Sequence, residues 1–409
     1  MQRIIIFTGK GGVGKSSVAV AHAFLSAEEN KKTLIISADM AHNLGDIFQT
    51  SIGHKVTKIS ENLDAIELDP NILRHEMFPK IKNAMSDLSG NYGFMLNNIN
   101  DNFSIPGFSN LFSLLKIKEF YDSQKYERIF VDCAPTGETL ALLKLPELLT
   151  WYMEKFFPVG KMMIRVLSPI SKIKYGVTLP DKETVNTIEK IHKKLLGLQE
   201  LLKNKEICST RLVCIPEKMI VEETKRNFMY LNLYNYQTDM IFINRVIDNK
   251  MENSFMEKWK NIQSKYIKEL EEVFTGIPIV KIPLYPKEIL GISAVKILCE
   301  TIKKSSENLF DTKVNVEHEE YIKCEDGYIL KIYLPQAKEE NIKVFVHNTD
   351  LNIKLNNFNR CIPLPNILRG SEITYKKFEE GTLSVHFKVL EKRVEEKEWE
   401  FWFIQERVE

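Results

Sequence analysis

The chain has 409 residues, of which 44% are hydrophobic and 27% charged, as in an ordinary globular protein long enough for two domains. Its 56 Lys and Arg against 55 Asp and Glu give a net charge of +1, which argues against a generally basic nucleic-acid binder. No apolar run is long enough to be an integral membrane segment, and the chain enters its first predicted strand without a signal peptide. We therefore expect a cytoplasmic protein without a nucleic-acid partner.

The first predicted elements are a strand, a glycine-rich loop and a helix. An apolar run at residues 3–7 predicts the strand, and residues 17–28 have the pattern of a helix. Between them, residues 9–16 (GKGGVGKS) match the phosphate-binding pattern G-x-x-x-x-G-K-[ST]. We expect Lys15 to reach the β- and γ-phosphates of ATP and the Ser16 hydroxyl to ligand Mg²⁺. The predicted nucleotide-binding residues here are Gly9, Lys10, Gly11, Gly12, Val13, Gly14, Lys15, Ser16 and Ser17.

A second lysine, Lys10, follows the first glycine of this loop. The form K-G-G-V-G-K-S resembles the deviant Walker A loop of dimeric P-loop ATPases, such as nitrogenase iron protein and the septum-site, partition and arsenite-pump ATPases. That resemblance implies that Lys10 crosses a dimer interface and touches the partner's nucleotide, where it would act as a catalytic charge. The alternative is a solvated surface lysine.

Further apolar runs predict strands at residues 33–37, 127–132, 211–215, 240–244 and 277–282, and helical patterns cover residues 181–204 and 252–274. Alternating strands and helices, with continuously apolar strands, indicate an α/β fold with a mostly parallel sheet covered on both faces. Ligands of such folds bind beyond the carboxyl ends of the strands. Three polar residues lie at such strand ends, so we expect them to converge beside the glycine loop: Asp39, Asp132 and Asn244.

The two aspartates suggest hydrolysis of the nucleotide. Asp132 stands where a Walker B aspartate would hold Mg²⁺ through water, and Asp39 is placed to orient or deprotonate the attacking water. The predicted metal-binding residues are therefore Ser16, Asp39 and Asp132. The alternative for each aspartate is a helix N-cap, where Asp is also favoured.

Two longer segments resemble the ArsA/GET family, which comprises arsenite-pump and tail-anchored-protein-targeting ATPases. Residues 37–44 (SADMAHNL) resemble its switch I sequence S-T-D-P-A-H-N-L, and residues 132–140 (DCAPTGETL) resemble its switch II sequence D-T-A-P-T-G-H-T-L. The similarity extends over residues 1–305 through shorter motifs at residues 105–107, 145–146, 213–226, 244–245 and 283–288.

The resemblance assigns roles to single residues. It implies that Asp39 activates water, with Lys10 and Lys15 as the other catalytic residues, and that Asn43 senses the γ-phosphate. It also implies that Asn244 reads the adenine edge, beside an adenine loop that contains Pro283, Leu284 and Pro286.

Departures from the family pattern bear on assembly. Met40 replaces a proline and Glu138 a common histidine, although neither change removes a catalytic group. The C-x-x-C pair that holds an interfacial zinc in the eukaryotic targeting factor has no counterpart before Glu271. Because the chain has one P-loop and not two fused halves, the resemblance implies a nucleotide-dependent symmetric homodimer.

Apolar helical stretches occupy residues 78–95, 103–115 and 148–173. The resemblance implies that an insert at about residues 70–180 forms a groove for a hydrophobic polypeptide client or membrane protein, for which flexible methionines are suited. The alternative is that these stretches are part of the core.

After residue 308 the helical period gives way to alternation, with predicted strands at residues 328–334, 342–346, 351–355 and 382–389. We predict a small all-β sandwich at residues 318–409, following an ATPase domain at 1–310. Residues 360–365 and 378–383 resemble the α-crystallin-like (small heat-shock) domain of some ArsA-type ATPases. Residues 391–398 should be solvated, and the aromatic residues 399–403 should pack against the protein.

The six cysteines form no C-x-x-C pair, so free thiols are expected at Cys133, Cys208, Cys214, Cys299, Cys324 and Cys361. A metal or arsenical site would need two or three soft ligands brought together by folding.

The leading hypothesis is a Mg²⁺-dependent ATPase whose dimer opens and closes to control a hydrophobic client. One alternative is the catalytic subunit of an arsenite or other anion pump, and another is a nucleotide-sensing scaffold with negligible turnover.

Overall fold

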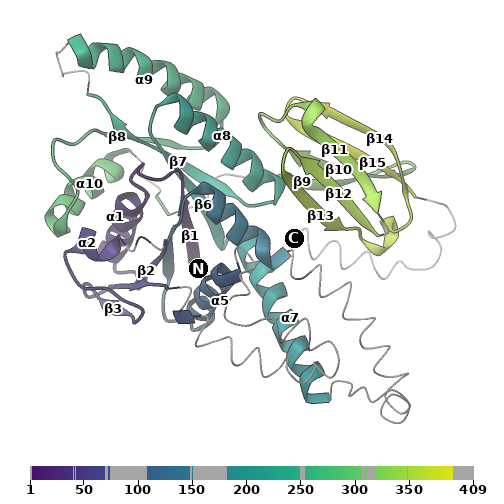
Figure 1. Cartoon of the computed structure of the whole chain (residues 1–409), viewed down its shortest axis with the longest axis horizontal. Coiled ribbons are helices and arrows are strands. Elements are labelled where there is room, and N and C mark those ends of the chain that lie inside the picture. The colour runs from purple at the N-terminus through teal and green to yellow at the C-terminus, as the bar shows by residue number, and fades with distance from the viewer. Residues whose placement is uncertain are drawn as a thin grey trace. The chain divides into compact units, whose positions relative to one another are not determined.

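The computed structural model describes residues 2–39, 41, 43–69, 72–73, 108–147, 150, 182–248, 254–305, 309–310, 318–347 and 349–389. The chain divides into two compact units (Figure 1). The α/β unit comprises Met1–Leu231 with Tyr236–Asn315, and the β unit comprises Asn232–Asn235 with Val316–Glu409.

The α/β unit is built on one eight-stranded sheet with the order β3-β4-β2-β5-β1-β6-β7-β8. Neighbouring strands run parallel except the β3–β4 pair, so the predicted mostly parallel sheet is confirmed. Its strands are β1 (Arg3–Thr8), β2 (Thr33–Ala38), β3 (Thr57–Lys58), β4 (Leu63–Glu67), β5 (Arg128–Cys133), β6 (Cys208–Cys214), β7 (Thr238–Val246) and β8 (Ile279–Pro283).

The central strands were predictable because every residue of β1, β2 and β6 is buried. Such strands have long apolar runs, since both faces of a parallel sheet are covered. Strands β3 and β4 were not predicted, because β3 has two residues and β4 interrupts its apolar residues with Asp64. The strand predicted at 127–132 lies one residue later, at Arg128–Cys133.

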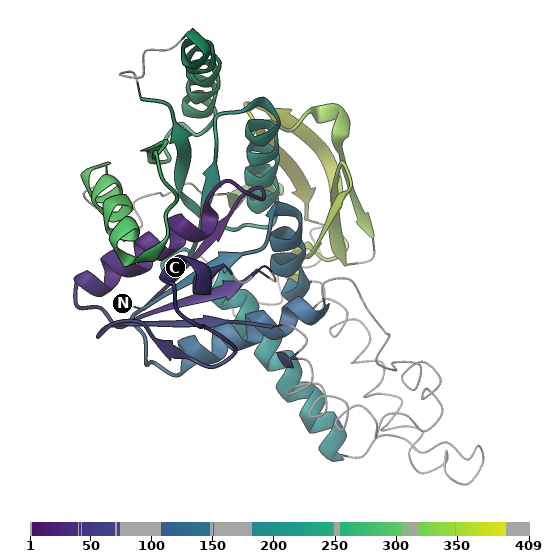
Figure 2. The ribbon, with the colours of Figure 1, turned by 60° about the vertical axis from the view of Figure 1, so that its left-hand side comes forward.

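Helices cover both faces of this sheet. Figure 2 shows α1 and α10 on one face and α5 and α7 on the other. The helices predicted at 181–204 and 252–274 are confirmed as α7 and α9, whereas α1 begins at Lys15 and not at Ser17. The described helices around this sheet are α1 (Lys15–Glu28), α2 (Leu44–Phe48), α5 (Phe108–Asp122), α7 (Lys182–Lys203), α8 (Lys218–Leu233), α9 (Ser254–Val273) and α10 (Gly291–Ser305).

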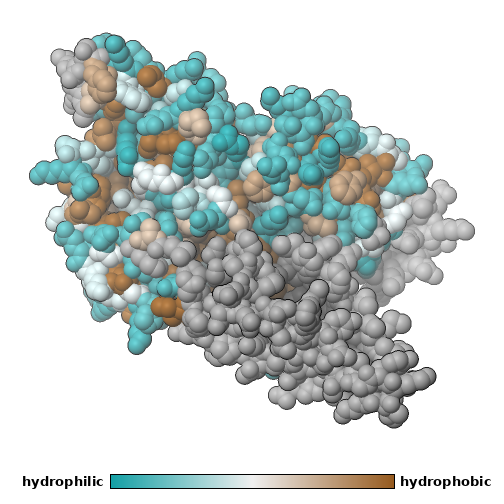
Figure 3. Space-filling view, viewed as in Figure 1, coloured by the Kyte–Doolittle hydropathy of each residue, from teal (hydrophilic) through white to brown (hydrophobic). Residues whose placement is uncertain are grey.

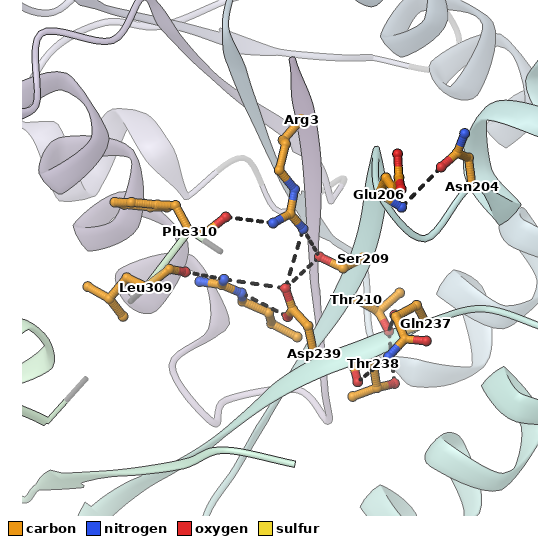
Figure 4. A network of polar contacts seen from close by, with 11 residues as sticks. Arg3, Asn204, Glu206, Ser209, Thr210, Gln237, Thr238, Asp239, Leu309 and Phe310 are labelled. Atoms are coloured by element: carbon orange, nitrogen blue, oxygen red, sulfur yellow. Dashed lines mark hydrogen bonds and ion pairs between the residues drawn. The ribbon is translucent and has the colours of Figure 1, made fainter. Parts of the chain in front are cut away.

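A buried polar network fixes β1, β6 and β7 to one another (Figure 4). The Asp239 carboxylate accepts hydrogen bonds from the Ser209 hydroxyl at 2.7 Å and from Arg211 Nε at 3.0 Å, and Arg3 approaches it at 3.5 Å. The two guanidinium groups also donate to the carbonyls of Leu309 and Phe310. Burial lowers the pKa of Arg3 and Asp239 opposes that effect, so the carboxylate is the counter-charge that lets two cations stay inside the protein.

The β unit contains two antiparallel sheets, which confirms the predicted all-β region. One has the order β14-β15-β10-β9 and the other β11-β12-β13. Three strands were not predicted: β14 exposes most of its side chains, β9 has no buried residue, and β13 (FNRCIP) mixes polar and apolar residues. The strands are β9 (Glu319–Cys324), β10 (Gly327–Tyr333), β11 (Ile342–His347), β12 (Asp350–Leu355), β13 (Phe358–Pro363), β14 (Glu372–Glu379) and β15 (Thr382–Lys388).

Several predicted features lie outside the described residues: the apolar stretch at 78–95, nearly all of 148–173, Met40, the charged segment 391–398 and the aromatic segment 399–403. The described part of the stretch 103–115 belongs to α5, where Phe112 is fully buried beside Leu111 and Leu114. This part therefore belongs to the core. None of the described helices combines the length and hydrophobicity needed to cross a membrane.

Candidate nucleotide site

The glycine loop follows β1 and leads directly into α1. Gly9 and Gly14 have φ values of +155° and +92°, which residues with a Cβ atom rarely adopt. A Cβ atom on Gly9 would lie 2.1 Å from the Val213 carbonyl oxygen, and one on Gly14 would lie 2.4 Å from Asn244 Nδ2. These glycines let the loop pass close to the ends of β6 and β7. The loop continues into α1 at Lys15, a buried residue whose ammonium group donates to the Lys10 carbonyl at 3.4 Å.

Asp132 lies beside this loop because β5 is the neighbour of both β1 and β2. In the sheet register, Asp132 is opposite Phe7 on one side and Ser37 on the other. The side chain is fully buried, and neither carboxylate oxygen has a hydrogen bond of normal geometry to a described residue. It therefore does not cap a helix.

The environment of Asp132 suits a cation. The pKa of Asp132 is raised to about 7, mainly by burial and also by the negative charge of Asp39, while the Ser16 hydroxyl and the Lys15 ammonium act to lower it. A buried carboxylate without a hydrogen bond of normal geometry is unfavourable unless it is protonated or neutralised. Oxygen ligands from a hydroxyl and two carboxylates match the preference of Mg²⁺, so the predicted set of Ser16, Asp39 and Asp132 fits this ion chemically.

We expect Asp132→Asn to stabilise the nucleotide-free protein at about pH 8 by about 1–3 kcal/mol, because it removes an unpaired buried charge. Since the pKa of Asp132 is raised in the folded state, its contribution to stability is present at acid pH and is lost as the pH rises through about 7. The gain should therefore be smaller at about pH 5 and should disappear only below the unfolded pKa of 3.8. Chemical denaturation at both pH values measures the effect.

The exposed Asp122, which pairs with Lys118 at 2.8 Å, provides the control. Asp122→Asn should change stability by less than about 1 kcal/mol at either pH. If Asp132→Asn destabilises the nucleotide-free protein at about pH 8, the Asp132 carboxylate is not the unfavourable buried charge described above.

Asp39 follows β2 and is half-buried at the same edge of the sheet. Its Oδ1 accepts a hydrogen bond from the Ala41 backbone N–H at 3.0 Å, before α2 begins at Leu44. The N-cap of α2 is Asn43, whose side chain makes no capping bond. Neither Asp39 nor Asn43 is thus used as a side-chain cap, and both lie on the segment between β2 and α2.

Lys10 is held within its own chain by a partner that the sequence analysis did not assign to the site. Its ammonium group lies 3.4 Å from Glu223 Oε2 on α8. The Thr136 hydroxyl, just beyond β5, donates to the same carboxylate. With 39% of its side chain exposed, Lys10 is accessible, but it is not the freely solvated lysine of the alternative interpretation. Glu223 is far from the loop in sequence, and only the fold brings it there.

The predicted adenine-reading residues also lie together. Asn244 Nδ2 donates to the Val13 carbonyl oxygen at 2.8 Å, which connects the end of β7 to the glycine loop. Val246 is in register with Pro283 and accepts a hydrogen bond from the Leu284 N–H at 2.8 Å. The segment that continues to Pro286 therefore starts beside the strand end that carries Asn244.

The strand, glycine loop and helix, with an acidic residue at the end of the adjacent strand, define a P-loop nucleotide-binding protein. Residues 2–304 match the family model described as "Anion-transporting ATPase", and residues 325–387 match the "HSP20-like domain found in ArsA". The chain therefore belongs to the ArsA family of ATPases, and the resemblance of the switch segments and of the C-terminal region is confirmed.

Curated relatives support this assignment. A "Putative arsenical pump-driving ATPase" of Prosthecochloris vibrioformis is 34% identical over 391 residues, covering 94% of this chain and 96% of its own length. A "Putative arsenical pump-driving ATPase 1" of Aquifex aeolicus is 30% identical over 94% of this chain and 99% of its own. An "ATPase GET3" of Phaeosphaeria nodorum is 32% identical over 71% of this chain and 91% of its own.

All six cysteines are free thiols, as predicted. Burial raises the pKa of Cys208, Cys214 and Cys299 to about 12, and it raises the pKa of Cys133 as well. Among the described residues, the group of three side chains able to hold a metal contains a single cysteine, Cys324. Folding thus creates a possible metal site that the cysteine spacing did not indicate.

Proposed function

We propose that this chain is a Mg²⁺-dependent ATP hydrolase that works as a homodimer. The observation that carries the proposal is the meeting of Lys15, Asp39 and the fully buried Asp132 carboxylate beside the glycine loop. Mg²⁺ would be held by Ser16 and Asp132, with Asp39 nearby, and would neutralise charge on the phosphates. Lys15 binds the β- and γ-phosphates, and Asp39 orients the attacking water and accepts its proton.

The contact between Lys10 and Glu223 suggests how the second subunit takes part. Lys10 is partly exposed and its ion pair is half-solvated, so releasing it costs little free energy. We propose that closure of the dimer over ATP transfers Lys10 from Glu223 to the partner's nucleotide, where its charge stabilises the transferring phosphoryl group. The release of Lys10 would also affect Thr136, because the Thr136 hydroxyl donates a hydrogen bond to the same Glu223 carboxylate.

The adenine base would be read at the ends of β7 and β8. The Asn244 amide nitrogen already donates a hydrogen bond to the Val13 carbonyl oxygen. To recognise adenine, Asn244 would have to exchange this bond for one to the base. Pro283, Leu284 and Pro286 supply the adjoining loop. Asn43 lies between β2 and α2, beyond Asp39, which is a suitable place to respond to the γ-phosphate.

We further propose that the hydrolysis cycle controls a hydrophobic polypeptide client in the cytoplasm. The ATPase GET3 relatives and the resemblance to targeting ATPases support this proposal. The domains would be an ATPase domain at 1–310, with a client-binding insert at about 70–180 from which the core elements α5 and β5 are excluded, and an α-crystallin-like domain at 318–409. On the face shown in Figure 3, hydrophobic residues of the described part form separate patches among hydrophilic ones.

The second candidate is an arsenite or anion pump subunit, because relatives that match 94% of this chain are named arsenical pump-driving ATPases. Arsenite is bound best by several thiolates, whereas four of the six cysteines are buried and have raised pKa values. A rate of ATP hydrolysis that arsenite stimulates would favour the pump subunit. Negligible ATP turnover would favour the third candidate, a nucleotide-sensing scaffold.

The dimer is tested by sedimentation of the Asp39→Asn variant, which should bind ATP without consuming it. We expect Mg²⁺ and ATP together to convert monomers to dimers, and ADP or ATP without Mg²⁺ to have a weaker effect. A parallel mixture with a hydrophobic helical peptide tests the client, which should bind the ATP-loaded dimer. A monomer–dimer balance that does not respond to ATP would contradict the proposal.

A further inference from the structure

A cluster in the β unit combines three different metal-ligating side chains. His386 on β15 points its Nε2 atom at Asp326 Oδ1, 3.0 Å away, and at Cys324 Sγ, 3.2 Å away. The separation between the sulfur and the Asp326 oxygen is 3.8 Å. Cys324 ends β9 and Asp326 lies in the turn to β10. Cross-strand pairing therefore brings together residues that are about sixty positions apart in the sequence.

The backbone holds this turn close to β15. Gly327 begins β10 and is in register with both Cys324 and Lys388. A Cβ atom on Gly327 would lie 1.9 Å from the Phe387 carbonyl oxygen, so no other residue allows the strands to approach this closely. The turn that carries Asp326 is consequently fixed against the strand that carries His386.

The imidazole ring is oriented from its other side. A register shift in β14 between Ile373 and Tyr375 leaves Thr374 without a cross-strand partner, and its hydroxyl contacts His386 Nδ1. The Tyr375 ring stacks on the imidazole at 4.9 Å with an interplanar angle of 6°. A metal at the cluster would take the Nε2 lone pair in place of the bond to Asp326 and leave the ring proton on Nδ1, where the Thr374 hydroxyl is placed to accept it, as in metal sites whose histidines are held by outer hydrogen bonds.

The arrangement differs from a nucleophilic triad. In a cysteine or serine triad, the nucleophile and the carboxylate occupy opposite nitrogens of the histidine, so that a proton can be relayed. Here the sulfur and the carboxylate both approach Nε2. Three potential ligand atoms around one point are typical of a metal site and not of a catalytic triad that relays a proton.

The distances agree with zinc. Tetrahedral Zn²⁺, with bonds of about 2.3 Å to sulfur and about 2.0–2.2 Å to nitrogen or oxygen, places its ligand atoms about 3.3–3.7 Å apart. The observed separations of 3.0, 3.2 and 3.8 Å require only small adjustments. A thiolate and an imidazole favour Zn²⁺ over Mg²⁺, which prefers oxygen.

We propose that Cys324, Asp326 and His386 bind one Zn²⁺ ion and leave its fourth coordination position open. The open position follows from exposure: 54% of the Asp326 side chain is accessible and Cys324 is half-buried, whereas His386 is 7% exposed. Solvent or a small anionic ligand would occupy that position. The site is distinct from the nucleotide site and does not depend on the proposed ATPase cycle.

The test is titration of the reduced full-length protein with Co²⁺, a spectroscopic substitute for Zn²⁺, in the presence of excess Mg²⁺. We expect one Co²⁺ per chain, with intense visible bands of tetrahedral coordination and a thiolate-to-metal charge-transfer band that Zn²⁺ abolishes on displacement. Cys324→Ser should remove the charge-transfer band, and Asp326→Asn and His386→Gln should each weaken binding at least about 10-fold. Thr374→Val should weaken it by about 10–100-fold through loss of the histidine's outer hydrogen bond.

Two matched variants in the same unit provide controls. Cys361→Ser changes the other half-buried thiol, on β13, and His347→Gln changes an exposed histidine on β11. Both should leave the Co²⁺ spectrum and affinity unchanged. Asp326 is in an exposed turn, so Asp326→Asn should stay folded, as circular dichroism would confirm. A parent protein without the charge-transfer band, or the same band in Cys324→Ser, would overturn the proposal.

Discussion

Asp39→Asn is expected to lower kcat for ATP hydrolysis by about 10²–10⁴-fold while leaving ATP affinity within a few-fold of the parent. The substitution keeps the size of the side chain, and its amide oxygen is still able to accept the bond from the Ala41 N–H. What it removes is the negative charge that orients water and accepts a proton. Single-turnover hydrolysis and equilibrium nucleotide binding separate the two quantities.

Asp46 is the control for Asp39. It is exposed in the first turn of α2, seven positions further along the same segment, so Asp46→Asn makes an identical change of charge away from the site. This variant should retain the parent's rate. Equal single-turnover rates for Asp39→Asn and the parent would remove Asp39 as the catalytic base, and negligible turnover in the parent would favour the scaffold alternative.

Mixing two inactive variants should restore activity if Lys10 acts across the dimer. Lys10→Met and Asp39→Asn are each expected to lose at least about 10²-fold in kcat as homodimers. In a mixed dimer, the Lys10→Met subunit keeps its own Asp39 and receives an intact Lys10 from its partner. One of its two sites is then complete, so equal amounts should regain about a quarter of the parent activity with random pairing.

The control is a mixture of Lys15→Met with Asp39→Asn. Lys15 is almost buried and begins α1 in its own chain, so no partner is able to replace it. This mixture should stay inactive at every ratio. If the Lys10→Met mixture also stays inactive although mixed dimers form, Lys10 acts within its own subunit, where the structure pairs it with Glu223. Steady-state phosphate release against mixing ratio measures both cases.

The glycine loop and the strands around it were predictable because their signals are local. Residues 9–16 predict a phosphate loop because its backbone conformation requires glycines at fixed positions. Continuous apolar runs predict strands that are buried on both faces of the sheet. Short or exposed strands such as β3 and β14 were missed, because their residues have no buried face to produce a pattern.

The partners of the predicted site residues were not predictable. Glu223 meets Lys10 only because α8 and the glycine loop lie at the same edge of the sheet, more than two hundred positions apart in sequence. The unpartnered state of Asp132 is likewise a property of its surroundings, since an aspartate at a strand end is equally consistent with a helix cap. Long-range neighbours depend on strand order, which spacing along the chain does not encode.

The sequence by itself determined the nucleotide loop, the α/β class and the change to an antiparallel β region, because side-chain periodicity and glycine positions express local backbone requirements. The tertiary structure alone decided which charges are paired, which carboxylate is buried without a partner, and that Cys324, Asp326 and His386 meet at one point. The physical reason is that burial and pairing arise between elements that are distant in the chain. Their energies depend on a neighbourhood that exists only after folding.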